Sequence, residues 1–301
     1  LRLDTYGLAE LPWEYVYLPL PDMPGERRGP EGFLALNRRV SLVRYESQAS
    51  PLAPLEAVRP LRLVALLASP QGPDYAPLDV EKERQNIAAA VKDVPALRPD
   101  FYPNATVDTL LDALVEPAQI FHFSGHGEFK GDMGDRYGST EGAGAVILVD
   151  EAGRAKPFPA QKLALNLNAR GVRLAVLAAC EVGVRDTASA WAGVVTALTH
   201  AGIPAVVGMQ FRVRDRNAIA FSRAFYRALA AGQSIDAAVT DGRFAIFNLG
   251  DDDERDWGVP VLYLRAEDGV LFPQEPAASG ASLESLRNFV PQMAVKGLDL
   301  G

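Results

Sequence analysis

The 301-residue chain has little cysteine, little histidine and no long apolar run. Its one cysteine cannot form an internal disulfide, and the sequence lacks a charged-then-apolar leader. Because disulfides and leaders are typical of exported proteins, we expect a cytoplasmic protein. No uninterrupted apolar run approaches the roughly 20 residues that a membrane-spanning helix needs, so we expect no membrane association.

The chain also lacks an excess of basic charge. Its formal net charge is −8 at pH 7, which argues against direct nucleic-acid binding. The single cysteine and three histidines do not have the spacing of zinc ligands, so we expect no metal site and no cofactor. The motifs of serine esterases and of P-loop proteins are absent as well.

What the chain does contain, from residue 61 onward, is a regular alternation of apolar strands with helices. Strands are predicted at 61–68, 97–102, 118–124, 142–151, 173–179, 203–209 and 259–264. Helices are predicted at 78–94, 104–114, 159–167, 187–199, 215–231 and 234–247. Near-continuously apolar strands between helices are typical of a mostly parallel sheet covered on both faces. A further short strand is predicted within 33–45.

Two of the predicted strands lead directly into a reactive side chain. His126 follows one strand within the run HFSGHG, and Cys180 follows another. The carboxyl ends of parallel strands share one edge of a sheet, so the imidazole and the thiol can meet there as base and nucleophile. We expect Gly125 and Gly127 to let the backbone turn sharply beside the imidazole. The N–H groups of Gly127 and Cys180 are then candidates for an oxyanion hole.

A plainer interpretation of the same residues stays open at this point. A lone cysteine at a strand end is commonly an inert, small apolar side chain. His122, two residues before Ser124 on the same strand face, is predicted to be a core or supporting group rather than a catalytic one. His200, at the end of a predicted helix, is predicted to be solvated.

Residues 122–127 (HFSGHG) and 177–183 (LAACEVG) resemble the two signature blocks of the CHAT family. The similarity covers about residues 8–266. CHAT domains belong to the caspase-like clan of cysteine peptidases, with the separases and gingipains. The resemblance implies a caspase-like three-layer αβα sandwich, with His126 as base, Cys180 as nucleophile and Gly127 lining the oxyanion hole. Many relatives have Ser or Thr where this chain has Ala178 and Val182, which affects fine geometry more than chemistry.

The resemblance also implies a function. It predicts a cysteine endopeptidase that cleaves a protein or peptide substrate through a thioester acyl-enzyme. Control by a partner domain, a ligand or oligomerisation is expected, in bacterial signalling or antiviral defence. The alternative hypothesis is a catalytically inactive scaffold that recruits or oligomerises partners. We divide the chain into an N-terminal segment (1–60), a catalytic core (61–272), and a linker with a C-terminal segment (273–301).

Substrate selection is left open among several charged residues. By resemblance to separase, the loop after the strand at 203–209 forms one wall of the substrate pocket. Asp215 there favours a lysine or arginine before the cut, whereas Arg212 or Arg214 favours an acidic residue or none at all. Glu181, beside the cysteine, is a third candidate. Asp215 is also predicted to be the N-cap of the helix that it opens.

Overall fold

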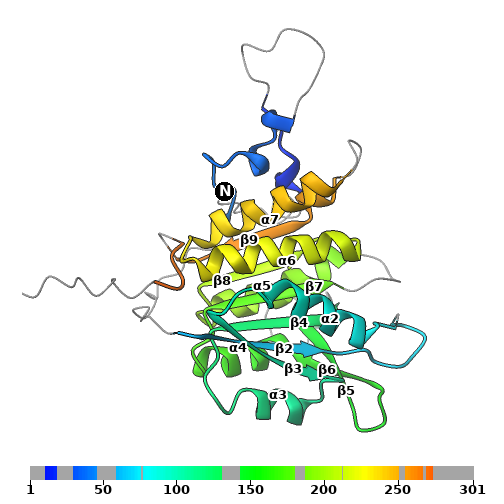
Figure 1. Cartoon of the computed structure of the whole chain (residues 1–301). Coiled ribbons are helices and arrows are strands. Elements are labelled where there is room, and N and C mark those ends of the chain that lie inside the picture. Colours follow the sequence, from blue (N-terminus) through cyan, green and yellow to red (C-terminus); the bar gives the residue numbers. More distant parts are fainter. Residues whose placement is uncertain are drawn as a thin grey trace, which may run out of the picture.

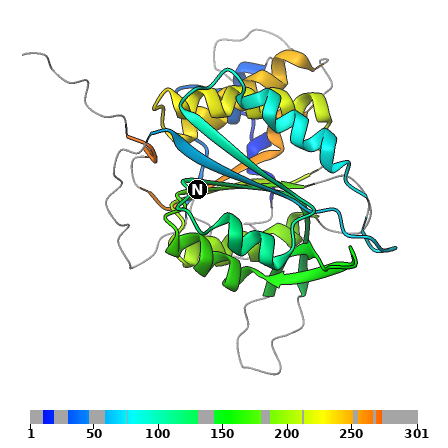
Figure 2. The same ribbon diagram turned by 60° about the horizontal axis from the view of Figure 1, so that its bottom comes forward.

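A twisted sheet lies at the centre of the molecule, with one layer of helices on each side (Figures 1 and 2). This computed structural model describes residues 11–18, 30–45, 59–75, 77–130, 143–179, 187–211, 213–250, 255–266 and 269–273. The strands are β1 (Arg44–Tyr45), β2 (Leu61–Leu67), β3 (Leu97–Pro103), β4 (Ile120–Lys130), β5 (Ala143–Val149), β6 (Ala155–Pro159), β7 (Leu174–Ala179), β8 (Ala205–Met209) and β9 (Pro260–Leu264). The α-helices are α2 (Val80–Val91), α3 (Val107–Ala113), α4 (Ala160–Ala169), α5 (Thr187–His200), α6 (Asp215–Ala230) and α7 (Ile235–Leu249).

Within the described residues the strand order is β1-β9-β8-β7-β4-β2-β3. The run from β8 to β3 is parallel throughout, as the sequence pattern predicts. The strand β9 runs antiparallel to β8, and β1 adds a short parallel pairing to β9. At the other edge, β3 carries Pro99 and Pro103. The strands β5 and β6 form an antiparallel extension that joins the sheet through the far half of β4.

Successive side chains of each central strand pack into two separate cores, one on each face of the sheet. On β2, Leu63 and Ala65 contact the cluster covered by α2, α6 and α7, whereas Val64 and Leu66 contact the cluster covered by α3, α4 and α5. This alternation explains why the central strands are apolar on both faces. The predicted three-layer αβα sandwich is therefore confirmed (Figure 2).

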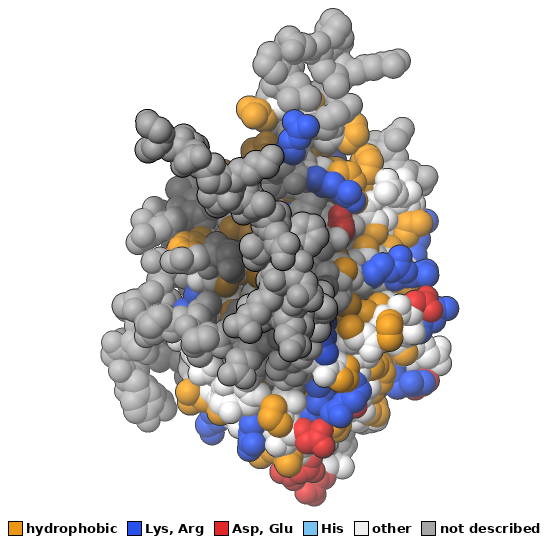
Figure 3. All heavy atoms as spheres, turned by 60° about the vertical axis from the view of Figure 1, so that its left-hand side comes forward, with side chains coloured by type: hydrophobic (Ala, Val, Ile, Leu, Met, Phe, Trp, Pro, Cys, Tyr) orange, Lys and Arg blue, Asp and Glu red, His pale blue; other side chains and the backbone are white. Residues whose placement is uncertain are grey.

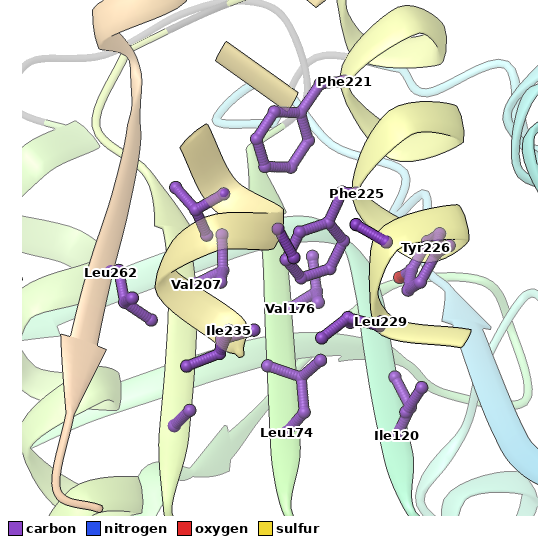
Figure 4. Close-up of a cluster of buried hydrophobic side chains, with 14 of the residues drawn as sticks. Ile120, Leu174, Val176, Val207, Phe221, Phe225, Tyr226, Leu229, Ile235 and Leu262 are labelled. Carbon is purple, nitrogen blue, oxygen red and sulfur yellow. The ribbon is translucent and has the colours of Figure 1, made fainter. Parts of the chain in front are cut away.

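The larger core is organised by α6. In Figure 4, Phe225 and Leu229 of this helix point onto Leu174 and Val176 of β7. Phe225 stacks on Phe221, with the ring centroids 5.3 Å apart. The aromatic side chains of α6 thus fix the helix directly over the middle of the sheet.

The N-terminal segment differs from its prediction. Residues 33–45 hold a 3₁₀ turn, η3 (Leu34–Leu36), and only the two-residue strand β1, so the predicted short strand is largely wrong. The segment is fixed by aromatic rings instead: Tyr15 and Phe33 both pack on Trp257, at centroid distances of 5.2 and 4.8 Å. Ring packing against a distant part of the chain leaves no periodic signal in the sequence.

A buried polar cluster holds this segment against the end of β8. The Arg44 guanidinium donates to Glu14 Oε2 at 3.0 Å and to Gln210 Oε1 at 3.1 Å. The Gln210 amide closes the triangle by donating to Glu14 Oε2 at 2.8 Å. A buried carboxylate is tolerable when its charge and lone pairs are satisfied in this way. The cluster fixes the backbone at Gln210, directly after β8.

The described surface is mixed in charge. On the face shown in Figure 3, lysine and arginine side chains form separate spots among apolar and acidic ones. None of the helices in the described ranges is long and apolar enough to cross a bilayer.

Two leucines on different helices test the core assignment. Leu229 in α6 is 1% exposed and Leu165 in α4 is 65% exposed. We expect Leu229→Ala to lower the free energy of unfolding by about 2–5 kcal/mol, because it leaves a cavity over the sheet. Leu165→Ala, the matched control, should stay within about 0.5 kcal/mol of the parent chain. Urea titrations followed by circular dichroism measure both, and equal losses would contradict the assignment.

Candidate active site

The strand β4 changes partners at the position of the predicted base. From Ile120 to Gly125 it pairs in parallel with β7, and Gly125 lies opposite Ala179. From His126 onward it pairs antiparallel with β5, and His126 lies opposite Ile147. His126 is therefore the first residue of β4 beyond the parallel sheet, at the carboxyl edge where α/β proteins bind ligands.

The predicted sharp turn beside His126 is absent. Gly125 and Gly127 both continue in β4, and neither has a positive φ. Close packing explains Gly127 instead, because a Cβ atom there would lie 3.2 Å from the Trp191 ring of α5. The motif thus uses its glycine to admit an indole ring rather than to bend the chain.

His126 lies on the sheet face that α2 covers. Its ring packs against that of Tyr75, between β2 and α2, with centroids 5.3 Å apart and planes inclined by 59°. Strand alternation agrees, because Gly127 faces α5 on the opposite side. Burial, with smaller contributions from Glu128 and Asp74, raises the pKa of the Tyr75 hydroxyl.

Three predicted site residues, Cys180, Glu181 and Arg212, lie outside the described residues. The description of β7 ends at Ala179, which immediately precedes Cys180 in the sequence. The structure therefore describes His126, Gly127 and Asp215 from the predicted set.

Asp215 is not the N-cap of α6, which corrects the sequence prediction. Arg214 takes the cap position with extended backbone angles, φ −65° and ψ 143°. The Asp256 carboxylate accepts a hydrogen bond from Asn217 Nδ2 at 2.8 Å and one from the Arg214 N–H, so another residue serves the start of this helix. Asp215 instead forms an ion pair with Lys82 of α2. Its negative charge in the first turn still complements the helix dipole.

A pocket of about 210 Å³ opens between α2 and α6 at the carboxyl edge of the sheet. Its walls come from the first turns of both helices and from the ends of β7 and β8, including Ala178 and Met209. Pockets for drug-sized ligands hold about 300–1,000 Å³, so this one matches a smaller group such as a single side chain.

Beneath the pocket, a chain of hydrogen bonds starts at a buried tyrosine. The Tyr226 hydroxyl lies 2.7 Å from His122 Nδ1, and His122 Nε2 lies 3.2 Å from Ser124 Oγ. Ser124 Oγ donates to Glu83 Oε1 at 2.9 Å. Since the Ser124 proton is directed to Glu83, its oxygen accepts from His122 Nε2–H, and Nδ1 accepts from Tyr226. His122 is thus a neutral supporting group with both nitrogens used, as predicted.

Burial determines the protonation states of these hydrogen-bonded side chains. It lowers the pKa of His122 to about 4 and raises that of Tyr226 far above its usual value. Burial also raises the pKa of Glu83, against the opposing effect of the Ser124 hydrogen bond. A low-dielectric environment disfavours the charged form of each group.

Sequence reasoning missed Tyr75, Glu83 and Tyr226 as parts of the site. Tyr75 meets His126 only through the fold, and no local motif marks it. Glu83 occupies a polar position of an amphipathic helix, where a solvated side chain is the ordinary expectation. His200 lies exposed at the end of α5, as predicted. Across the described ranges, no group of three or more His, Cys, Asp and Glu residues has the geometry of a metal site.

A mostly parallel sheet between two helix layers, with a histidine and a pocket at its carboxyl edge, defines an α/β protein of the three-layer sandwich class. Residues 1–266 match the model of the CHAT domain. The chain belongs to the CHAT domain family, which confirms the sequence resemblance. Comparison with curated proteins finds no match.

Several solved structures share part of the architecture. The chain is similar to gingipain R, an Arg-specific cysteine proteinase of Porphyromonas gingivalis, at 14% identity and a TM-score of 0.42, over 71% of this chain and 47% of that one. Separase in the Saccharomyces cerevisiae separase–securin complex is 16% identical with a TM-score of 0.44, over 86% of this chain and 15% of that one. The Drosophila initiator caspase Dronc is 10% identical with a TM-score of 0.41, over 86% of this chain and 94% of that one. The chain thus spans less than half of the gingipain chain and a small part of the separase chain.

The buried imidazole gives a prediction for pH dependence. The pKa of His122 is about 4 in the folded chain and about 6.5 when exposed, so the unfolded chain binds the proton more readily. Its contribution to stability is complete above pH 6.5 and falls by up to about 3 kcal/mol as the pH drops toward 4. The raised pKa of Glu83 has the opposite effect on stability as the pH changes, so the two contributions partly cancel. The titration of the His122 imidazole is therefore a more direct measurement than the stability of the protein.

Nitrogen chemical shifts of the His122 ring measure this directly. We expect the neutral Nε2–H form to persist down to about pH 5, with a midpoint near 4. A titration midpoint near pH 6.5 would contradict the burial of His122 among these hydrogen bonds. His122→Gln provides the assignment of the signal.

Proposed function

We propose that this chain is a cysteine endopeptidase in which Cys180 is the nucleophile and His126 is the general base. One observation carries the proposal: Gly125 and Ala179 are opposite each other in adjacent parallel strands. In the sequence, His126 directly follows Gly125 and Cys180 directly follows Ala179. A nucleophile and a base on neighbouring strand ends have the proximity that covalent catalysis requires.

The proposed reaction has two halves. The Cys180 sulfur attacks the peptide carbonyl carbon while its proton passes to His126, and the carbonyl electron pair moves onto the oxygen. The C–N bond then breaks, His126 protonates the leaving amine, and a thioester acyl-enzyme remains. Water, deprotonated by His126, hydrolyses the thioester and restores the thiol. The N–H groups of Gly127 and Cys180 are the proposed donors to the oxyanion.

Two groups in the structure support a positioning role around the base. The Tyr75 ring restricts the His126 imidazole on one side. The β4–β5 pairing fixes the backbone of His126 and Gly127 on the other. Asp215, Arg212 and Glu181 remain the proposed substrate-binding residues. The proposal includes a protein or peptide substrate and control by a partner domain, a ligand or oligomerisation, in bacterial signalling or defence.

Single substitutions at the two proposed catalytic residues test the function. We expect Cys180→Ala and His126→Ala each to reduce cleavage of a diverse peptide library by at least about 1,000-fold, because the two groups act as a unit. Mass spectrometry of the products measures the loss. His200→Ala, at an exposed helix end, is the control and should cleave at the parental rate.

A second readout does not depend on knowing the substrate. A peptidyl chloromethyl ketone library should add one peptide mass to the parent chain, mapped to Cys180, and should add none to Cys180→Ala. Equal cleavage by parent and Cys180→Ala chains would refute the proposal. A parent chain that neither cleaves nor is labelled would be a scaffold instead.

A further inference from the structure

The pocket between α2 and α6 is lined in part by the ends of strands near the two proposed catalytic residues in the sequence. Ser124 lies opposite Ala178 in the parallel pairing of β4 with β7. Ala178 lines the pocket, and Ser124 donates to Glu83 inside it. His126 follows Ser124 by two residues of β4, or roughly 7 Å, and Cys180 follows Ala178 by two residues in the sequence. With Cys180 as the nucleophile, a substrate side chain in this pocket would belong to the residue whose carbonyl is attacked.

The pocket is lined by more negative than positive charge. Its carboxylates belong to Asp79 and Glu83 of the α2 end and to Asp215 of α6, and its one cation among the described lining residues is Lys82. Asp79 is engaged as the N-cap of α2, accepting from the Lys82 N–H at 3.0 Å. The Lys82 ammonium is engaged by Asp215 at the exposed rim.

Glu83 differs from the other two carboxylates because it lies deeper. It is partly buried, while Asp79 and Asp215 belong to the helix starts at the rim. Its hydrogen-bond partners are the neutral side chains of Ser124 and Asn86, the Lys82 charge has the smallest effect on its pKa, and none of the described residues forms an ion pair with it. A carboxylate held away from water without a countercharge is costly, and a cation brought beside it removes that cost.

We propose that this pocket receives a positively charged substrate side chain, arginine or lysine, and that Glu83 at its base selects for that charge. The inference rests on the proposed function, since it names the residue before the bond that Cys180 would cut. One hydrogen bond from Ser124, which is itself held by His122 and Tyr226, keeps the carboxylate in place. Glu83 is thus a specificity residue, and Ser124 and His122 are its positioning residues.

An anionic side chain fits the same pocket poorly. The positive ends of α2 and α6 lie at the rim, but Asp79 and Asp215 already complement them. An incoming carboxylate would also meet Glu83 with no cation deep in the described part of the pocket. Arg214, which would favour an acidic substrate, is exposed and does not line it.

The first test compares two isosteric substitutions on the same helix. Glu83→Gln removes the charge and keeps the shape, and Glu81→Gln does the same on the solvent side of α2, where Glu81 pairs with Arg84. For a peptide with arginine before the cut, we expect Glu83→Gln to lower kcat/KM at least about 30-fold, a typical value for a lost charge-assisted pair. With citrulline, the neutral isostere of arginine, the change should be under threefold. Glu81→Gln should match the parent chain on both.

The second test does not require cleavage. Parent, Glu83→Gln and Glu81→Gln chains are titrated with N-acetyl-arginine amide and N-acetyl-citrulline amide, and backbone NMR shifts are followed at Ala178 and Met209. We expect the arginine compound to bind at least fivefold more tightly than the citrulline compound, except in Glu83→Gln. Thermal unfolding of each variant shows that it is folded.

The outcomes separate this inference from the proposed function. Cys180-dependent cleavage with an acidic or apolar preference, or an arginine preference that survives Glu83→Gln, would overturn the inference and leave the peptidase. Absence of any cleavage, with Glu83-dependent binding of the arginine compound, would overturn the peptidase and leave a cation pocket. Equal binding of both compounds by the parent chain would overturn the pocket assignment.

Discussion

The parallel pairing of β4 with β7 is the constraint on which the rest of the site depends. It fixes Ser124 opposite Ala178 and Gly125 opposite Ala179, which are the residues just before His126 and Cys180 in the sequence. A shift of one residue would turn every side chain of a strand to the other face. Because both faces of these strands are buried, such a shift would disrupt two cores at once. The register at this edge of the sheet is therefore stabilised by the apolar packing of both faces.

The two faces of the sheet contribute differently to the site. The α5 side supplies packing, with Trp191 against the place where Gly127 has no side chain. The α2 and α6 side supplies polar groups: Tyr75 beside the imidazole, and the chain from Tyr226 through His122 to Glu83. Buried polar chains of this kind are stable when every member is satisfied, and each nitrogen of His122 has a partner. The site thus has apolar packing on the α5 face of the sheet and hydrogen-bonded polar groups on the α2 and α6 face.

Much of the architecture followed from apolar periodicity, since strands such as 61–67 are apolar on both faces and helices such as 215–230 on one. The direction of β9 did not, because a buried strand has the same composition in either direction. Asp215 had the right residue type for a cap, but Asp256, far away in the sequence, serves the start of α6. The motifs identified His126, whereas Tyr75 and Glu83 acquire their roles only from neighbours that folding brings to them.

The prolines of β3 have a consequence for assembly. This strand forms one edge of the sheet, and an open edge is a template for another strand. Pro99 and Pro103 have no N–H, and the N–H of Leu97 already donates to Val94 O at 2.9 Å. Within parallel sheets proline directs its missing donor outward, so the outer side of β3 is short of hydrogen-bond donors. A strand from a second copy of the chain could form few hydrogen bonds with β3. Self-association by edge-to-edge pairing of two sheets is therefore disfavoured at this edge.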